Sequence, residues 1–464
     1  MLHIIHMIER RHGRARASSI VLRLLLGSAL LLALGLGLLL SGRAMAQDAA
    51  TPDPVATATR LLDRLDAGAF TDAEAMFSPE MAAAVPADKL KAVWESLPAQ
   101  AGKATGRGTA KATAGGGGTL VEIPLQYEKA ALLGRIAVGS DGRIVGFQVQ
   151  PAPAPVVAAP VAEDAAYVER DMAVGEGDRA LPGTLAMPKG EGPFPAVVLV
   201  HGSGPQDRDE TIGPNKPFLD IARGLAAQGI AVLRYEKRTK ARPQEFTGGT
   251  FGVDDETTND AVLAVDALRK TAGIDPKRIF VLGHSQGGMM APRIASVSGH
   301  VAGLVLMAAP ARSLLDIVIE QNRRLAVLDD GKTSDAERDA IAQFTAQVRQ
   351  TRDPATDIAT RTLLGQPAGY WRSIDAVDPV ADAAAVALPM LVLQGARDIQ
   401  VVDADWGRWR GAFHADDKVS FKLYEKLNHL GIAGEGEGNL AEYQQPGHVD
   451  ATLIDDVASW IKAH

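Results

Sequence analysis

The chain has 464 residues, of which 46% are hydrophobic, so it can bury a large core, is not a disordered chain, and is long enough for two globular units. The net charge is −8, and it becomes −13 without the basic leader of residues 1–46. This acidic balance argues against a nucleic-acid partner, because binding a phosphate backbone requires a basic face.

Residues 1–46 have the features of a secretory signal peptide. A basic start is followed by the apolar run Leu24–Leu40 and by Ala44-Met45-Ala46, a small-x-small pattern that suits signal peptidase. We therefore predict cleavage before Gln47 and an exported protein, periplasmic or secreted. The alternative is an uncleaved N-terminal anchor, because about 17 apolar residues come near the lower limit for spanning a bilayer. The absence of cysteine excludes disulfides and a lipid-modified cysteine.

A small α+β domain is expected over residues 51–150. Its first half has apolar residues at helical spacing, among them Leu61, Leu65 and Leu90. After a glycine-rich break, three strands are predicted at 120–127, 132–138 and 144–149, and Ser140-Asp141-Gly142 forms the last turn. Residues 151–163, rich in Pro and Ala, are expected to form an extended linker.

The rest of the chain, 164–464, alternates apolar strands with helices, which predicts βαβ units and a doubly wound, mostly parallel sheet. The strands are expected at 196–200, 230–235, 279–282, 301–307, 388–393 and 419–424, and the helices at 218–227, 261–269, 289–297 and 449–461. Between Pro310 and Leu388 the strand signal disappears in favour of charged, periodic helix. Residues 311–387 are therefore predicted to form a helical cap inserted between two strands.

The pentapeptide Gly283-His284-Ser285-Gln286-Gly287 lies between a predicted strand and a predicted helix that opens at Gly288. A serine nucleophile in this position needs a turn with strained backbone geometry, and glycines on both sides remove side chains that would collide. Ser285 is the predicted nucleophile, and the backbone N–H of Gln286 at the helix start is a predicted donor to the oxyanion.

A second oxyanion donor is expected in His201-Gly202-Ser203-Gly204, which follows the strand at 196–200. In this arrangement the backbone N–H of Ser203 joins that of Gln286. The alternative interpretation of this segment is a simple turn after a strand.

The remaining candidates for a catalytic triad follow two later strands. Asp398 comes just after the strand at 388–393, at the carboxyl edge of the sheet, and His429 follows the strand at 419–424. When the nucleophile lies on a turn between a strand and a helix, the triad residues follow along the chain in the order Ser, Asp, His. Asp403 and Asp405 lie close enough in the sequence to be alternative acids, and His448 and His414 are the alternative bases.

These segments resemble the α/β-hydrolase superfamily, specifically bacterial serine esterases and lipases with a helical cap, over Tyr167–His464. The resemblance implies that Ser285 attacks an acyl carbonyl, that His429 transfers the proton and that Asp398 orients the imidazole. The chain departs from many relatives at 234–240, where they have a glycine-containing turn. The N-terminal unit resembles the cystatin-like α+β domains that precede the catalytic domain in some bacterial esterases.

The predicted activity is hydrolysis of carboxylic esters with short to medium acyl chains, with a small-molecule ester as the partner. A serine in the pentapeptide disfavours dehalogenase and epoxide-hydrolase chemistry, which use a carboxylate nucleophile. Two alternatives stay open: a serine peptidase or aminopeptidase of the same fold, and a non-catalytic exported binding protein. No cofactor is expected, no membrane contact is expected after signal cleavage, and no metal is expected because His201, His284 and His300 lack ligand spacing.

Overall fold

The computed structural model describes residues 53–115, 118–152, 160–246, 248, 250–327, 332–333 and 335–464. The predicted signal peptide and residues 153–159 of the predicted linker lie outside these ranges. The chain divides into two compact units, one N-terminal to Val156 and one that holds nearly all of the chain from Val156 on.

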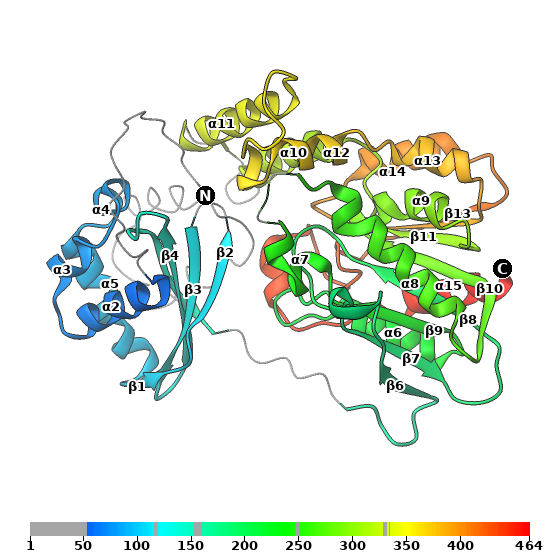
Figure 1. Cartoon of the computed structure of the whole chain (residues 1–464), viewed down its shortest axis with the longest axis horizontal. Coiled ribbons are helices and arrows are strands. Elements are labelled where there is room, and N and C mark those ends of the chain that lie inside the picture. Colours follow the sequence, from blue (N-terminus) through cyan, green and yellow to red (C-terminus); the bar gives the residue numbers. More distant parts are fainter. Residues whose placement is uncertain are drawn as a thin grey trace. The chain divides into compact units, whose positions relative to one another are not determined.

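The N-terminal unit is a five-stranded antiparallel sheet with helices packed on it (Figure 1). Its elements are α2 (Pro54–Asp66), α3 (Phe70–Glu74), α4 (Pro79–Ala84), α5 (Ala87–Ala101), β1 (Ala104–Arg107), β2 (Lys111–Gly115), β3 (Gly118–Tyr127), β4 (Ala131–Gly139) and β5 (Ile144–Pro151). The strand order is β1-β3-β4-β5, and β2 also pairs with β3. Alternate residues of β3 and β4, such as Val121 and Ile136, pack with Leu61 and Leu65 of α2.

An eight-stranded sheet organises the C-terminal unit, in the order β13-β12-β11-β10-β8-β9-β7-β6. Its strands are β6 (Tyr167–Asp171), β7 (Gly183–Pro188), β8 (Phe194–Val200), β9 (Ala231–Tyr235), β10 (Ile274–His284), β11 (Gly303–Met307), β12 (Met390–Gly395) and β13 (Val419–Tyr424). The sheet is parallel from β9 through β8 to β13, and β6 and β7 are antiparallel. The predicted fold class, a mostly parallel doubly wound sheet after a small α+β unit, is confirmed.

Helices cover both faces of this sheet (Figure 1). They are α6 (Pro217–Ala227), α7 (Arg238–Ala241), α8 (Asn259–Arg269), α9 (Gln286–Ser298), α14 (Asp403–Phe413) and α15 (Ala451–Ala463), with short helical turns η3 (Gly177–Arg179), η4 (Pro243–Phe246), η5 (Asp254–Thr258) and η7 (Leu440–Gln444). On one face, Phe218 of α6 and Trp460 of α15 pack against alternate strand residues such as Leu199 and Leu282. On the other face α9 packs against β10, α8 and α13. Strands β8, β9 and β11 are consequently buried along almost their whole length, as expected for a sheet covered on both sides.

The insertion between β11 and β12 is helical, as predicted. It contains α10 (Leu314–Leu325), α11 (Asp335–Arg352), η6 (Leu363–Gly365), α12 (Ala368–Asp375) and α13 (Pro379–Val386). The first three α-helices pack on one another, whereas α13 packs on α9 of the sheet. The cap proper is thus formed by α10, α11 and α12, and the last helix of the predicted segment belongs to the layers around the sheet.

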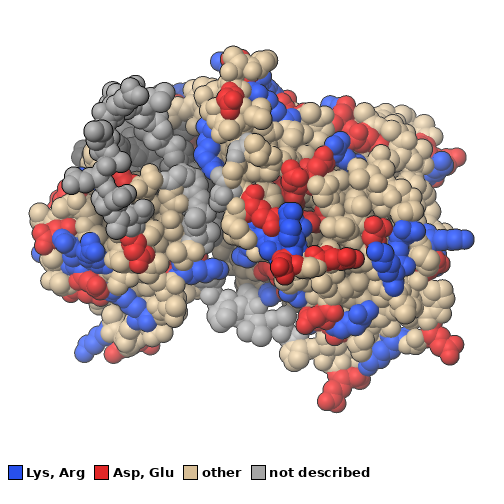
Figure 2. Space-filling model, in the orientation of Figure 1, with Lys and Arg blue, Asp and Glu red and all other residues tan. Residues whose placement is uncertain are grey.

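Charged side chains of both signs are interspersed on the visible face of the molecule (Figure 2). Among the described residues many charged side chains pair, for example Arg293 with Asp254 and Arg312 with Glu320.

Candidate active site

Ser285 occupies a sharp bend between β10 and α9. Its backbone has φ 52° and ψ −121°, a strained conformation that non-glycine residues adopt only where the surroundings enforce it. A Cβ added to Gly283 would lie 2.2 Å from the carbonyl oxygen of Gly287, and one added to Gly287 would lie 2.1 Å from that of Val200. Both positions therefore require glycine, as the sequence predicts.

Helix α9 begins at Gln286, two residues earlier than expected. As the first residue of the helix, Gln286 has a backbone N–H with no acceptor inside the helix. This N–H lies at the positive end of the helix dipole and directly after the serine. It is therefore free to donate to an anion that forms beside Ser285.

Asp398 and His429 meet at the carboxyl edge of the sheet. Nδ1 of His429 lies 2.8 Å from Oδ2 of Asp398, and the two side chains are 4% and 0% exposed. The other carboxylate oxygen accepts hydrogen bonds from the backbone N–H groups of Gln400 and Val401 at 2.8 and 3.0 Å. The side chain of Gln394 donates a further bond to Oδ2 at 3.2 Å. These donors hold the carboxylate in one orientation toward the imidazole.

The alternative acids and bases occupy other environments. Asp403 is exposed at the start of α14, and buried Asp405 accepts hydrogen bonds from Arg312 and the backbone N–H of Ala311. His414 is exposed beside the carbonyl of Arg410. The remaining candidate, exposed His448, pairs with Asp220 at 3.1 Å. Among the acids and histidines considered from the sequence, only Asp398 and His429 form a hydrogen-bonded pair with each other.

The segment after β8 lies beside the serine. A Cβ built on Gly202 would be 3.3 Å from the Cβ of Ser285, so the Gly202 backbone faces the nucleophile candidate. Within the described part of the chain, no acceptor binds the backbone N–H of Ser203. Both predicted oxyanion donors, Ser203 N–H and Gln286 N–H, thus have no competing acceptor among the residues that the structure describes.

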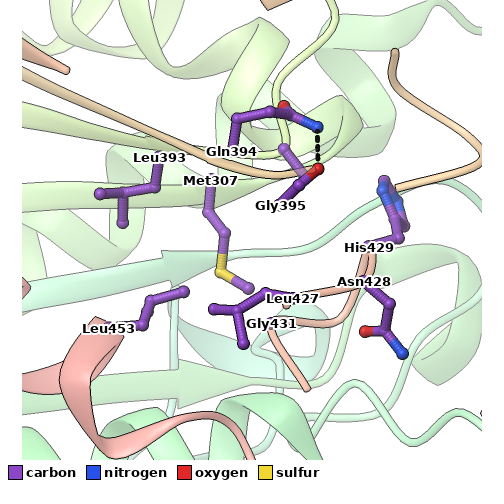
Figure 3. A pocket seen from close by; sticks show the side chains of 10 residues that line it. Met307, Leu393, Gln394, Gly395, Leu427, Asn428, His429, Gly431 and Leu453 are labelled. Atoms are coloured by element: carbon purple, nitrogen blue, oxygen red, sulfur yellow. Dashed lines mark hydrogen bonds between the residues drawn. The ribbon is translucent and has the colours of Figure 1, made fainter. Parts of the chain in front are cut away.

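A small cavity lies beneath the loop that carries His429 (Figure 3). Its volume is about 10 Å³, and it is lined by Met307, Leu393 and Leu453 together with Gln394, residues 427–429 and Gly431. A space of this size holds about one water molecule, which excludes it as a substrate site. Figure 3 also shows the Gln394 amide bonded to the carbonyl of Gly395, so this side chain fixes the end of β12 as well as Asp398.

His284, the residue before the serine, is buried between two acceptors. Its Nδ1 lies 3.0 Å from Oε2 of Glu210, and its Nε2 lies 2.9 Å from the carbonyl oxygen of His429. Both ring nitrogens therefore act as donors, which requires the imidazolium form. Burial lowers the pKa of His284, but the Glu210 carboxylate outweighs it and raises the pKa above its ordinary value. Since the rings of His284 and His429 are 4.7 Å apart, this cation also orients the loop of the candidate base.

His201 is a buried histidine of the opposite kind. Its ring packs against Phe218 and Tyr235, and its Nε2 lies 3.0 Å from the carbonyl oxygen of Asp207. Burial lowers the pKa of His201 from 6.5 to about 4, although Glu210 acts in the opposite direction. His201 is therefore neutral at pH 7, with its proton on Nε2.

We expect the free energy of unfolding to decrease at acidic pH, because His201 is buried in its neutral form. In the unfolded chain this histidine binds a proton below about pH 6.5, and in the folded chain only below about pH 4, so stability is full above pH 6.5 and falls as the pH drops toward 4. The loss amounts to about 3 kcal/mol. Urea unfolding from pH 7.5 to 4.5 should therefore show a shallower pH slope in His201→Gln than in the unaltered chain, and equal slopes would contradict the assignment.

Over the ranges that the structure describes, no group of three His, Asp or Glu side chains is arranged to hold a metal ion. None of the helices in those ranges combines the length and the apolar character needed to cross a bilayer.

Comparisons with known proteins identify the family of the chain. Residues 197–435 match the alpha/beta hydrolase family, and the chain is 35% identical over 393 residues to esterase EstD of Thermotoga maritima, an alignment that covers 84% of this chain and 91% of the relative. The chain belongs to the α/β-hydrolase family. This result confirms the family predicted from the sequence. Residues 58–147 of this α/β hydrolase match a second family, described as a protein of unknown function (DUF3887).

Solved structures similar to this α/β hydrolase include an esterase and a peptidase. An esterase of Pyrococcus furiosus is 16% identical with a TM-score of 0.40, and the match covers 67% of this chain and 96% of that one. A puromycin-hydrolyzing peptidase of Mycobacterium tuberculosis is 19% identical with a TM-score of 0.42, and the match covers 76% of this chain and 46% of that one.

The structure of this α/β hydrolase also adds residues that sequence reasoning missed. Gln394 fixes Asp398, and Glu210 pairs with His284. Glu210 has a positive φ of 51° and is 1% exposed, but its residue type and spacing look like those of any loop acid. Only the fold shows that a strained, buried carboxylate stands behind the serine.

Proposed function

We propose that this α/β hydrolase is a serine carboxylesterase that acts on esters with short to medium acyl chains. The observation that carries the proposal is the strained Ser285 on the bend before α9, in a fold that also brings Asp398 and His429 together. The 35% sequence identity to esterase EstD of Thermotoga maritima supports an ester as the substrate class.

In the proposed reaction, Ser285 Oγ attacks the acyl carbonyl carbon and His429 accepts the hydroxyl proton. Asp398 stabilises the imidazolium that forms and keeps Nδ1–H directed toward itself, so that Nε2 is the basic nitrogen. The N–H groups of Ser203 and Gln286 stabilise the oxyanion. His429 then returns the proton to the leaving alcohol, and the acyl-enzyme is hydrolysed when His429 activates a water molecule.

The test is a substrate panel with the purified chain. We expect turnover of p-nitrophenyl acetate and butyrate, with rates that decline for long acyl chains, and slower or no cleavage of aminoacyl p-nitroanilides. Cleavage of the anilides without ester turnover would replace the proposal by a peptidase. Absence of turnover on both classes, with a folded chain, would favour the non-catalytic binding protein.

A further inference from the structure

Four buried charged side chains lie behind the two candidate oxyanion segments. Glu210, Lys237, Glu256 and His284 are each between 1% and 3% exposed. They form two ion pairs, Glu210 with His284 at 3.0 Å and Lys237 with Glu256 at 2.8 Å. Two acids thus balance two bases, which makes burial of all four tolerable. The first pair holds the loop of His429, whereas the proposed reaction uses neither member of the second.

The backbone of Gly202 is held by this cluster at both ends. Its N–H donates to Oε1 of Glu210 at 2.6 Å, and its carbonyl oxygen accepts a hydrogen bond from Nζ of Lys237 at 2.8 Å. The carbonyl of Gly202 and the N–H of Ser203 belong to one planar trans peptide unit and point in opposite directions. Lys237 therefore fixes the direction of the Ser203 N–H by holding the other end of that unit. A charged donor at the carbonyl also polarises the unit and strengthens the N–H as a donor.

The partner of Lys237 reaches the second oxyanion segment. Oε2 of Glu256 accepts hydrogen bonds from Nε2 of Gln286 at 3.0 Å and from the hydroxyl of Tyr370 at 2.7 Å. Glu256 lies on η5, a π-helical turn, a local geometry that is frequent at functional sites. Tyr370 belongs to cap helix α12 and is 7% exposed. One buried carboxylate thus connects Lys237, the residue after the serine and the cap.

We infer that Lys237 and Glu256 are positioning residues that align the two oxyanion donors with each other. The inference rests on the proposed function and adds residues that touch no substrate atom. Lys237 follows the end of β9, and its side chain supplies the hydrogen bond that fixes the Gly202 peptide unit.

The test is the double variant Lys237→Met with Glu256→Gln, because removing one charge alone would leave the other buried and unpaired. After Glu256→Gln the side-chain oxygen can still accept from Gln286 and Tyr370, so the double variant removes the ion pair together with the Lys237 bond to Gly202. Removing an oxyanion donor lowers kcat by about 10²- to 10³-fold, and a misdirected donor keeps part of its stabilisation of the oxyanion. We therefore expect kcat on p-nitrophenyl butyrate to fall about 10- to 100-fold. KM should change less than about threefold, since a ground-state ester depends little on these donors. Inhibition by butylboronic acid, which forms a tetrahedral adduct on serine, should weaken by a similar factor to kcat.

A matched control removes a neighbouring ion pair of similar burial. Arg238 and Asp260 are 8% and 2% exposed, and Nε of Arg238 lies 2.9 Å from Oδ2 of Asp260. Neither side chain makes a hydrogen bond to Gly202 or Gln286. The double variant Arg238→Met with Asp260→Asn should keep kcat and boronate affinity within about threefold. An equal loss in this control would overturn the inference, because general loosening would then explain both results.

A second variant keeps the inference testable if the first double variant does not fold. Tyr370→Phe retains both charges and removes one donor from Glu256, and we expect kcat to fall at least about threefold with KM unchanged. Undiminished kcat and boronate affinity in a folded Lys237→Met, Glu256→Gln chain, or in Tyr370→Phe where that chain does not fold, would overturn the inference. Failure of the proposed function is a separate result, because it would appear as absence of ester turnover in the unaltered chain.

Discussion

Replacing Ser285 with alanine is expected to lower ester turnover by about 10⁵- to 10⁶-fold while the chain stays folded. The variant removes the only atom that can form the acyl-enzyme in the proposed reaction, and what remains is the stabilisation by the oxyanion donors and by binding. The backbone at this position is strained, with φ 52°, and alanine has the same steric requirement there as serine. A change in thermal stability of more than a few degrees is therefore not expected.

The measurement combines kcat on p-nitrophenyl butyrate with labelling by a fluorophosphonate. The reagent should add one phosphonyl group to the unaltered chain, on the peptide that contains Ser285, with release of fluoride. Ser285→Ala should not be labelled. Ser298→Ala is a matched control because Ser298 ends the helix that Gln286 begins, about 18 Å away along α9. Labelling and turnover that persist in Ser285→Ala would assign the nucleophile to another residue.

The central strands of the C-terminal unit were predictable because they are apolar along nearly their whole length. Segment 196–200 corresponds to the end of β8, and 388–393 overlaps β12. In a sheet covered on both faces, burial requires continuous apolar runs, and such runs are visible in a single sequence. The edge strands of the N-terminal unit lack this signal: β1 reads ATGR and β2 reads KATAG, and both form only by pairing with β3.

The pairing of Asp398 with His429 was predictable for a topological reason. Parallel strands place their carboxyl ends at one edge, so residues that follow β10, β12 and β13 meet there although they are far apart in the sequence. The sequence therefore indicated Asp398 and His429. In the structure, Oδ2 of Asp398 lies 2.8 Å from Nδ1 of His429. It did not separate them from nearby Asp405 or His448 by residue type, and the separation comes from the hydrogen bonds that each one makes.

The buried charge cluster was not predictable, because the burial of a charged residue depends on its partner. Lys237 and Glu256 lie in segments with many charged residues, where solvent exposure is the ordinary expectation. Their burial follows from the tight approach of the loops after β8 and β9 to α9. The same holds for Gln286, whose backbone role was expected from the motif but whose side chain contacts Glu256.

Replacing His429 with alanine is expected to be about as damaging as the serine change, on the order of 10⁵- to 10⁶-fold in kcat, because the members of a triad act as a unit. Asp398→Asn should cost about 10⁴-fold. The asparagine amide can donate to Nδ1 of His429, which favours the tautomer with the proton on Nε2. That tautomer cannot accept the serine proton, and the imidazolium that forms during the reaction also loses its counter-charge.

The two exposed alternatives serve as controls for these changes. His448→Ala removes a histidine whose only side-chain bonds among the described residues are to Asp220 on α6, and Asp403→Asn alters an exposed residue at the start of α14. Both variants should keep kcat within about threefold, since neither side chain contacts Ser285, Asp398 or His429. A loss of activity in His448→Ala with little effect of His429→Ala would move the base to residue 448. The Ser, Asp, His assignment would then fail even if Ser285 remained the nucleophile. Three donors, Gln394, Gln400 and Val401, hold the Asp398 carboxylate toward His429, and it has no hydrogen bond to residue 448.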